Sequence, residues 1–197
     1  MFYIIDAGRR ISTPIDHLLA PLRVGATAAV RPVAQSDGAR PPAIAAYSQA
    51  ARAHAEADQR PRRLQVASEL MSPVRCAAMT ETVVEAWAIL LRERFHHLPI
   101  VDITGELRGI ISDRDLLRAA ASHSHEETSE WTLERLMQRR VIAAGPSAPL
   151  RELAEVMTQR RIGAVPVVDD RNRPVGIVTR ADLLRAIVHQ APLELWG

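Results

Sequence analysis

The sequence predicts an α+β protein built from two tandem β-α-β-β-α units that pack with pseudo-twofold symmetry, preceded by an irregular and partly helical N-terminal extension. Two observations predict this fold. Residues 70–119 and 136–187 align from end to end, with one extra residue in the second copy, and each copy mixes short apolar strands with amphipathic helices. A unit of about 50 residues buries too little surface to be stable alone, so the copies are expected to share a core.

Matching residues fix the register of this duplication. Met71 matches Met137 at an offset of 66 residues, and Asp115 matches Asp182 at an offset of 67. Repeated supersecondary units stack so that each buries its apolar face against a neighbour. The duplication is therefore the strongest indicator of the fold.

Each copy opens with a short helix that ends at a Leu-Met pair, followed by an extended stretch and an amphipathic helix. Thr82 and Glu85 form a T-x-x-E capping box in the first copy. Pro149 suits the first turn of the matching helix in the second copy. Helical spacing predicts which positions face the core. They are Val83, Ala86, Ile89 and Leu90 in the first copy and Leu150, Leu153, Val156 and Met157 in the second.

A β-hairpin and a last helix complete each copy. The apolar runs LPIVD and VPVVD are typical of buried strands, and a four-residue turn joins each to a second strand, LRGII or PVGIV. The last helices begin at SDRDLL and TRADLL. Between the copies, residues 120–130 are polar and are expected to form a loop.

The N-terminal extension lies outside the duplication. FYII and RRIS are separated by DAG and are expected to form a hairpin, and Thr13-Pro14 begins a helical turn that runs through Leu19. The remaining expectations are an irregular Pro- and Gly-rich arm at 20–42, an Ala-rich helix at 43–59 and a linker at 60–63. The expected domains are 1–63, 64–122 and 131–190, with a C-terminal tail at 191–197.

Composition narrows the function classes. The formal net charge is only +2, and it divides into +4 for residues 1–63 and −2 for residues 64–197. This is not the basic stripe of a nucleic-acid-binding protein, so no nucleic-acid partner is expected. No apolar run approaches the roughly 20 residues that span a bilayer, so no membrane partner is expected. The single cysteine, Cys76, and an N-terminus without a secretory signal favour a cytoplasmic location.

The repeated motifs resemble the CBS domain, named after cystathionine β-synthase, which occurs in tandem pairs. The resemblance covers residues 66–190 and rests on the Leu-Met helix ends, on HLPIVD and AVPVVD, and on two G-I-[IV]-[ST]-x-x-D-L-L segments. It implies a regulatory module that is not an enzyme and needs no cofactor. Its candidate ligands are AMP, ADP, ATP and S-adenosylmethionine, bound in clefts between the units. Ligand binding would change the conformation of the module, and this change would be transmitted to an unidentified protein partner or within a homodimer.

All but one of the candidate ligand-binding residues lie in two S/T-x-x-D motifs; the exception is His97. In each motif a hydroxyl and a carboxylate lie in the first turn of a helix, where free N–H groups and the positive end of the helix dipole suit a phosphate. The resemblance implies that the aspartate accepts hydrogen bonds from ribose hydroxyls. The candidates are Ser112, Arg114, Asp115, Thr179, Arg180, Asp182 and His97. No catalytic residue is predicted.

Two of these features have simpler explanations. S/T-x-x-D is also a common helix cap that satisfies backbone donors. His97 follows His96 directly before a strand, where the resemblance places a basic group near phosphates, but the second copy has Gly163-Ala164 at this position. A partly exposed histidine at a strand edge is the alternative.

Other functions stay open. A ligand-free dimerisation scaffold, with residues 1–63 binding a partner, would show no change in melting temperature with any nucleotide. An enzyme with its site in residues 1–63 would need catalytic spacing that this segment lacks, and a weak nucleic-acid binder would act through the same basic arm. His123, His125, Glu126 and Glu127 do not have the spacing of a zinc site, so no metal site is predicted.

Overall fold

The computed structural model describes residues 1–19 and 66–190. The expected arm at 20–42, the Ala-rich helix at 43–59, the linker at 60–63 and the tail at 191–197 lie outside the described residues. The two described ranges belong to the same structural unit of the chain.

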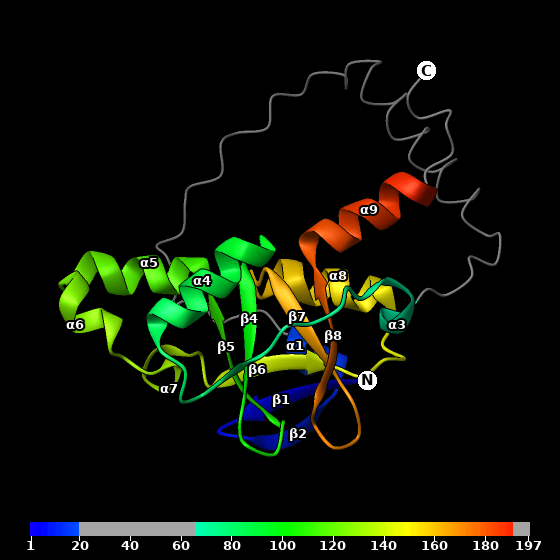
Figure 1. The fold of residues 1–197 in the computed structure, drawn as a ribbon. Coiled ribbons are helices and arrows are strands. Elements are labelled where there is room, and N and C mark those ends of the chain that lie inside the picture. Colours follow the sequence, from blue (N-terminus) through cyan, green and yellow to red (C-terminus); the bar gives the residue numbers. More distant parts are fainter. Residues whose placement is uncertain (20–65, 191–197) are drawn as a thin grey trace, which may run out of the picture. The chain divides into compact units, whose positions relative to one another are not determined.

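Two sheets form the centre of this unit (Figure 1). The first has the order β3-β4-β5, with β3 (Ala77–Ala78), β4 (His97–Val101) and β5 (Leu107–Ser112). The second has the order β2-β1-β6-β7-β8, with β1 (Phe2–Asp6), β2 (Arg9–Thr13), β6 (Arg140–Ala144), β7 (Ala164–Val168) and β8 (Pro174–Thr179). In both sheets the first strand of the repeat runs parallel to the next, which then forms an antiparallel hairpin.

Four longer helices complete the two repeats: α4 (Val83–Glu93), α5 (Asp113–Ser122), α8 (Leu150–Gln159) and α9 (Arg180–Gln190). The element orders β3-α4-β4-β5-α5 and β6-α8-β7-β8-α9 confirm the predicted duplication of a β-α-β-β-α unit. Shorter helices are α1 (Ile15–Leu19), α3 (Ala67–Leu70), α6 (His125–Ser129) and α7 (Leu133–Leu136). In Figure 1 the longer helices lie in the upper part of the view and the β1–β2 hairpin lies at the bottom.

The segment before each repeat packs against the other repeat. After α3, Ser72 forms a β-bridge with Ile177 of β8, and after α7, Gln138 forms the equivalent bridge with Ile110 of β5. The neighbouring methionines fill space that only glycine leaves open. A Cβ atom at Gly176 would lie 2.3 Å from Met71 Sδ, and one at Gly109 would lie 2.5 Å from Met137 Sδ. We call this exchange of contacts the crossed packing. The two sets of contacts are equivalent, as pseudo-twofold symmetry requires.

Three clusters of buried side chains form the core. One belongs to the second repeat with the N-terminal segment, a second belongs to the first repeat, and the third joins the sheets through Tyr3, Ile5, Leu107, Val141 and Val168. The predicted core positions of both long helices are confirmed. Ala86, Ile89, Leu90, Leu153, Val156 and Met157 are buried, and Val83 and Leu150 are partly buried.

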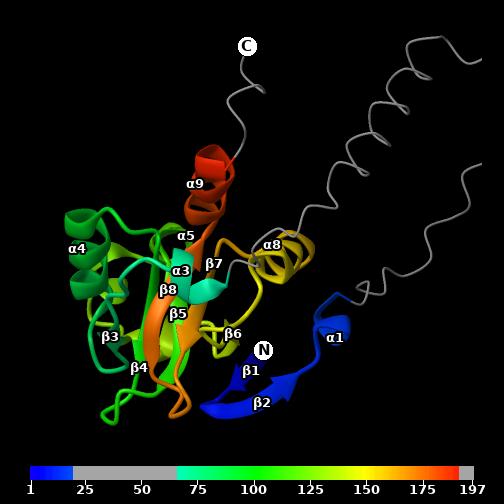
Figure 2. The ribbon, with the colours of Figure 1, turned by 90° about the vertical axis from the view of Figure 1, so that its right-hand side faces the viewer.

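The predicted hairpin and helical turn at the N-terminus are confirmed as β1, β2 and α1 (Figure 2). Strand β1 also pairs with β6 in antiparallel fashion, so the hairpin enlarges the sheet of the second repeat. At the hairpin turn, Gly8 has φ +86°, and the Arg108 side chain of β5 passes so close that a Cβ atom would overlap it. The positive φ favours glycine here, and a larger residue would also have to displace the Arg108 side chain.

The predicted loop over residues 120–130 is wrong in part. Helix α5 runs to Ser122, and residues 125–129 form α6. Ser124 Oγ accepts a hydrogen bond from the Glu127 amide at 3.3 Å, and the Glu127 carboxylate accepts one from the Ser124 amide at 3.2 Å. This S-x-x-E capping box starts a helix despite the polar composition of the segment.

Candidate ligand-binding site

Both S/T-x-x-D motifs form helix caps at the ends of hairpins. At the start of α5, Asp115 Oδ2 accepts hydrogen bonds from the Ser112 amide at 2.9 Å and from Ser112 Oγ at 2.6 Å. At the start of α9, Asp182 Oδ2 accepts from the Thr179 amide at 2.8 Å and from Thr179 Oγ1 at 2.6 Å. The capping explanation of these motifs therefore holds, and capping uses the Oδ2 atom of each aspartate.

The two aspartates differ in what surrounds the other oxygen. Asp182 Oδ1 accepts hydrogen bonds from Ser72 Oγ at 2.8 Å and from Arg185 Nη1 at 2.9 Å, and the side chain is 2% exposed. Asp115 Oδ1 has the Arg118 guanidinium at 4.0 Å, and the Asp115 side chain is 18% exposed. Asp115 thus keeps an acceptor that a ligand hydroxyl could use, whereas both oxygens of Asp182 are already occupied.

Hydrogen bonding keeps the Asp182 carboxylate ionised. Burial raises the pKa of this carboxyl group, but hydrogen bonds from Thr179, Ser72 and Arg185 outweigh burial and hold the pKa below its usual range. Asp182 is therefore a buried anion that is satisfied within the protein, which is the condition under which buried charge is tolerated.

The His97 side chain extends from β4 of the first repeat to the second repeat. It is paired with Ser112 in the β4–β5 hairpin, and its ring lies against Gly163 of the second repeat, where a Cβ atom would be 2.7 Å from ring atoms. Burial lowers the pKa of His97, with Asp113 and Asp115 opposing this shift and Arg180 adding to it. The ring is therefore neutral at pH 7. The missing side chain at Gly163, which stood out in the sequence, makes room for it.

The backbone N–H groups at these helix starts are largely in use. In α5, the Asp113 amide donates to the His96 carbonyl at 3.2 Å, the Arg114 amide to Asp113 Oδ1 at 2.7 Å and the Asp115 amide to Ser112 Oγ at 3.3 Å. The expectation of free N–H donors for a phosphate is wrong for this turn, because the local side chains cap it. Any phosphate would have to be held by side chains instead.

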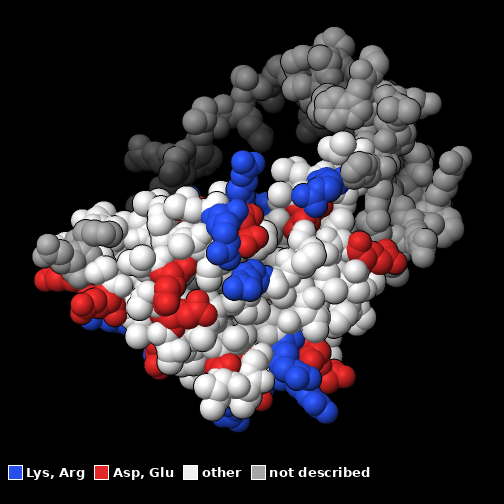
Figure 3. Space-filling view, in the orientation of Figure 1, with Lys and Arg blue, Asp and Glu red and all other residues white. Residues whose placement is uncertain are grey.

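Two of the predicted site residues are arginines that carry positive charge at the helix starts. Arg114 and Arg180 occupy equivalent positions in the two motifs, and both are exposed. Within residues 1–19 and 66–190, neither side chain forms an ion pair. On the face shown in Figure 3, acidic side chains lie among the basic ones of the described residues, so the charge does not form a basic stripe.

Sequence reasoning missed three residues that shape these sites. Arg118 and Arg185 follow their aspartates in a repeated D-L-L-R pattern, and an i,i+3 pair on a helix is a signal that could have found them. Ser72 lies 110 residues before Asp182, and no local pattern predicts their contact. The crossed packing of the repeats brings them together.

A family model for the CBS domain matches residues 66–122 and 133–189. The chain belongs to the CBS domain family. The two matched segments contain both S/T-x-x-D motifs and the crossed helices α3 and α7.

Relatives in this family differ widely in length. The chain is 40% identical over 116 residues to an L-aspartate semialdehyde sulfurtransferase from Methanocaldococcus jannaschii, and the match covers 59% of this chain and 22% of that enzyme. It is 38% identical over 101 residues to a CBS domain-containing protein from Dictyostelium discoideum, covering 47% of this chain and 70% of that protein. The chain therefore spans less than a quarter of the enzyme that it matches.

A solved structure extends the comparison. The CBS domain pair of protein MJ0100, crystallised with 5′-methylthioadenosine and S-adenosyl-L-methionine, is 35% identical to this chain with a TM-score of 0.58. The match covers 64% of this chain and 98% of that structure.

No helix within residues 1–19 and 66–190 has both the length and the apolar character needed to cross a membrane.

Proposed function

We propose that the chain is a regulatory CBS domain pair that binds an adenosine-containing ligand at the start of α5 and passes the change to a partner. The observation that carries this proposal is the partly exposed Asp115 carboxylate, whose Oδ1 atom has its nearest cation at 4.0 Å. The adenosine compounds in the crystals of the MJ0100 pair, a structure 35% identical to this chain, support the ligand class. The proposed role contains no catalytic step.

Asp115 is suited to a ribose because a carboxylate oxygen can accept hydrogen bonds from neighbouring hydroxyls. Arg114 and Arg180 would pair with the phosphates of AMP, ADP or ATP. A ligand without phosphate, such as 5′-methylthioadenosine or S-adenosylmethionine, would not need them. The neutral His97 ring, which lies against Gly163, would border the ligand without adding charge.

The second motif is proposed to be structural. A ribose at Asp182 would have to replace the hydrogen bonds from Ser72 and Arg185, which occupy Oδ1 in a buried position. Displacing hydrogen bonds to a buried charge costs free energy that a ligand must recover. We therefore expect one ligand per chain.

Thermal unfolding of the full chain tests the ligand class. A ligand that binds only the folded state stabilises it by about 2.7 kcal/mol at a hundredfold excess over Kd. We expect at least one of AMP, ADP, ATP, S-adenosylmethionine and 5′-methylthioadenosine to raise the melting temperature, and Asp115→Ala to remove the shift. Asp170→Ala, an exposed acid on the β7–β8 turn, is the control that keeps it. A panel without any shift would contradict the proposal and favour the ligand-free scaffold.

We also propose that a second copy of the chain is a partner. Helices α4, α5 and α9 carry large apolar side chains that are between 49% and 64% exposed. They are Val84, Leu91, Leu117, Leu184, Ile187 and Val188. Helices α4 and α5 contact each other, and exposed apolar side chains on neighbouring elements are typical of protein–protein interfaces. A homodimer would bury them.

A further inference from the structure

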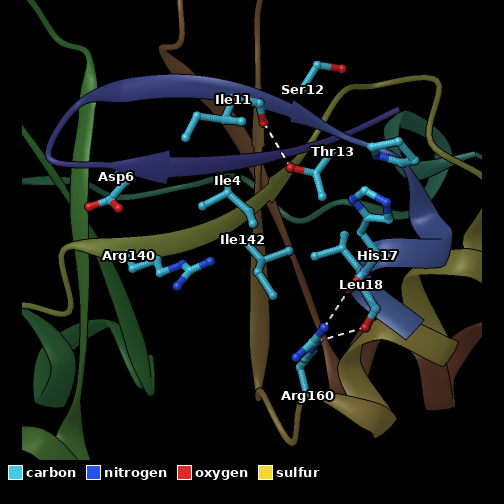
Figure 4. Close-up of a pocket in the computed structure, with 11 residues that line it drawn as sticks. Ile4, Asp6, Ile11, Ser12, Thr13, His17, Leu18, Arg140, Ile142 and Arg160 are labelled. Atoms are coloured by element: carbon cyan, nitrogen blue, oxygen red, sulfur yellow. Dashed lines mark hydrogen bonds between the residues drawn. The ribbon is translucent and has the colours of Figure 1, made fainter. Parts of the chain in front are cut away.

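A second candidate site lies away from the two helix starts, where the N-terminal hairpin and α1 meet β6 and α8 (Figure 4). The pocket has a volume of about 560 Å³, within the range of small-molecule sites. Much of its wall comes from residues 1–19, which precede the segments matched by the family model. The pocket is thus a feature of this chain beyond its CBS repeats.

The floor of the pocket is apolar and crosses three strands. Ile4 of β1 is paired with Ile11 of β2 on one side and with Ile142 of β6 on the other, so the three side chains form a row on the same face of the sheet. Ile11 is 45% exposed. Covering the exposed apolar surface of this side chain with a ligand would be favourable in free energy. This row would bind an apolar group of branched shape.

Helix α1 forms a fixed wall beside this floor. Arg160, which follows α8, donates hydrogen bonds to the Leu18 carbonyl at 2.7 Å and to the His17 carbonyl at 2.8 Å (Figure 4). These bonds satisfy carbonyl groups at the end of α1, and the Leu18 side chain is buried in the core. The wall is therefore in place before any ligand arrives.

The other end of the pocket carries one acidic and one basic side chain, Asp6 and Arg140. In the next row of the sheet, Asp6 is paired with Arg9 on one side and with Arg140 on the other. Figure 4 shows Asp6 and Arg140 together at this end, beyond the isoleucine side chains. Among the residues that the structure describes, Arg140 makes no hydrogen bond or ion pair through its side chain. Asp6 is thus the one acidic residue among those lining the pocket, against two arginines, Arg140 and Arg160.

The geometry points to a binding site for a small organic anion with a carboxylate and a short branched hydrocarbon chain. The carboxylate would pair with Arg140, whose planar guanidinium can hold it by two parallel hydrogen bonds. The hydrocarbon chain would cover Ile4, Ile11 and Ile142. The excess of arginine over aspartate disfavours a cation of the same shape. This inference does not depend on the adenosine site.

Methyl NMR of the full chain, labelled at isoleucine δ1 carbons, tests the site with 4-methylpentanoate as the probe. We expect the Ile4, Ile11 and Ile142 signals to shift in a saturable way. Arg140→Gln should weaken this binding by about tenfold or more, since a charge-assisted hydrogen bond is lost. Arg139→Gln is the matched control, because Arg139 pairs with Glu134 and does not line the pocket.

Several outcomes would overturn the assignment. They are the absence of saturable shifts, equal binding of the neutral 4-methylpentanamide, or equal weakening by Arg139→Gln. The melting-temperature response of Arg140→Gln to adenosine compounds should match that of the wild type. This comparison separates a failure of the anion site from a failure of the proposed function.

Discussion

At the scale of single residues, the two motif aspartates show how one pattern can serve two purposes. Asp115 and Asp182 make the same cap hydrogen bonds, yet only Asp182 is also held by Ser72 and Arg185. The repeated sequence indicated a helix cap as the alternative to a binding site at both positions, and both caps are formed. It could not show the difference between them, because that difference depends on Ser72, a residue from the opposite repeat.

The Asp182 contacts predict an acid-dependent stability. Because hydrogen bonds hold the pKa of Asp182 below its unfolded value, its contribution is complete above about pH 4 and is lost as pH falls further. Asp182→Asn should lower the free energy of unfolding at pH 7 by about 2 kcal/mol and flatten its fall at acidic pH. Urea unfolding between neutral and acidic pH measures both. An effect no larger than that of Asp115→Asn would contradict the assignment.

At the scale of elements, capping and periodicity predicted helices and strands that the structure contains. The capping box of Thr82 and the apolar face of α4 are examples, since both depend on residues a few positions apart. The same kind of signal at Ser124 starts α6, although the polar composition of the segment predicts a loop. Contacts such as that of Met71 with Gly176 could not be predicted, because they join elements far apart in the sequence.

The crossed packing predicts coupling between Met71 and Gly176. Gly176→Ala places a methyl group within 2.3 Å of Met71 Sδ and should cost about 1–3 kcal/mol by overpacking. In a Met71→Ala background the same change should cost less by about 1 kcal/mol or more, because contacting residues are not additive. A double-mutant cycle of urea unfolding measures the coupling. Additive effects would show that α3 does not pack on β8 in solution.

At the scale of the whole described unit, the N-terminal hairpin is part of the second sheet. The sequence predicted the hairpin itself from FYII and RRIS, but its pairing with β6 was beyond local patterns. Through Tyr3 and Ile5 the hairpin also enters the cluster that joins the two sheets. A segment outside the family repeats thus stabilises the repeats and builds the pocket beside Arg140.

The exposed apolar side chains of α4, α5 and α9 predict a dimer that a charged substitution in the interface would disrupt. Leu184 is 64% exposed on α9, and Leu184→Glu should convert a dimer to a monomer, because a carboxylate buried in an apolar interface lacks a partner. Sedimentation equilibrium measures the mass. Ile103→Glu is the control, since this residue is fully exposed on the β4–β5 turn and should leave the mass unchanged. A wild-type monomer would contradict the proposed partner.

The binding of an adenosine-containing ligand at Asp115 is tested most directly by isothermal titration calorimetry. The ligand is the compound that raises the melting temperature most, and the proteins are the wild-type chain, Asp115→Asn and Asp182→Asn, each checked for folding by circular dichroism. We predict one ligand per wild-type chain, loss of binding in Asp115→Asn and retained binding in Asp182→Asn. Two ligands per chain, or binding that survives in Asp115→Asn, would contradict this assignment.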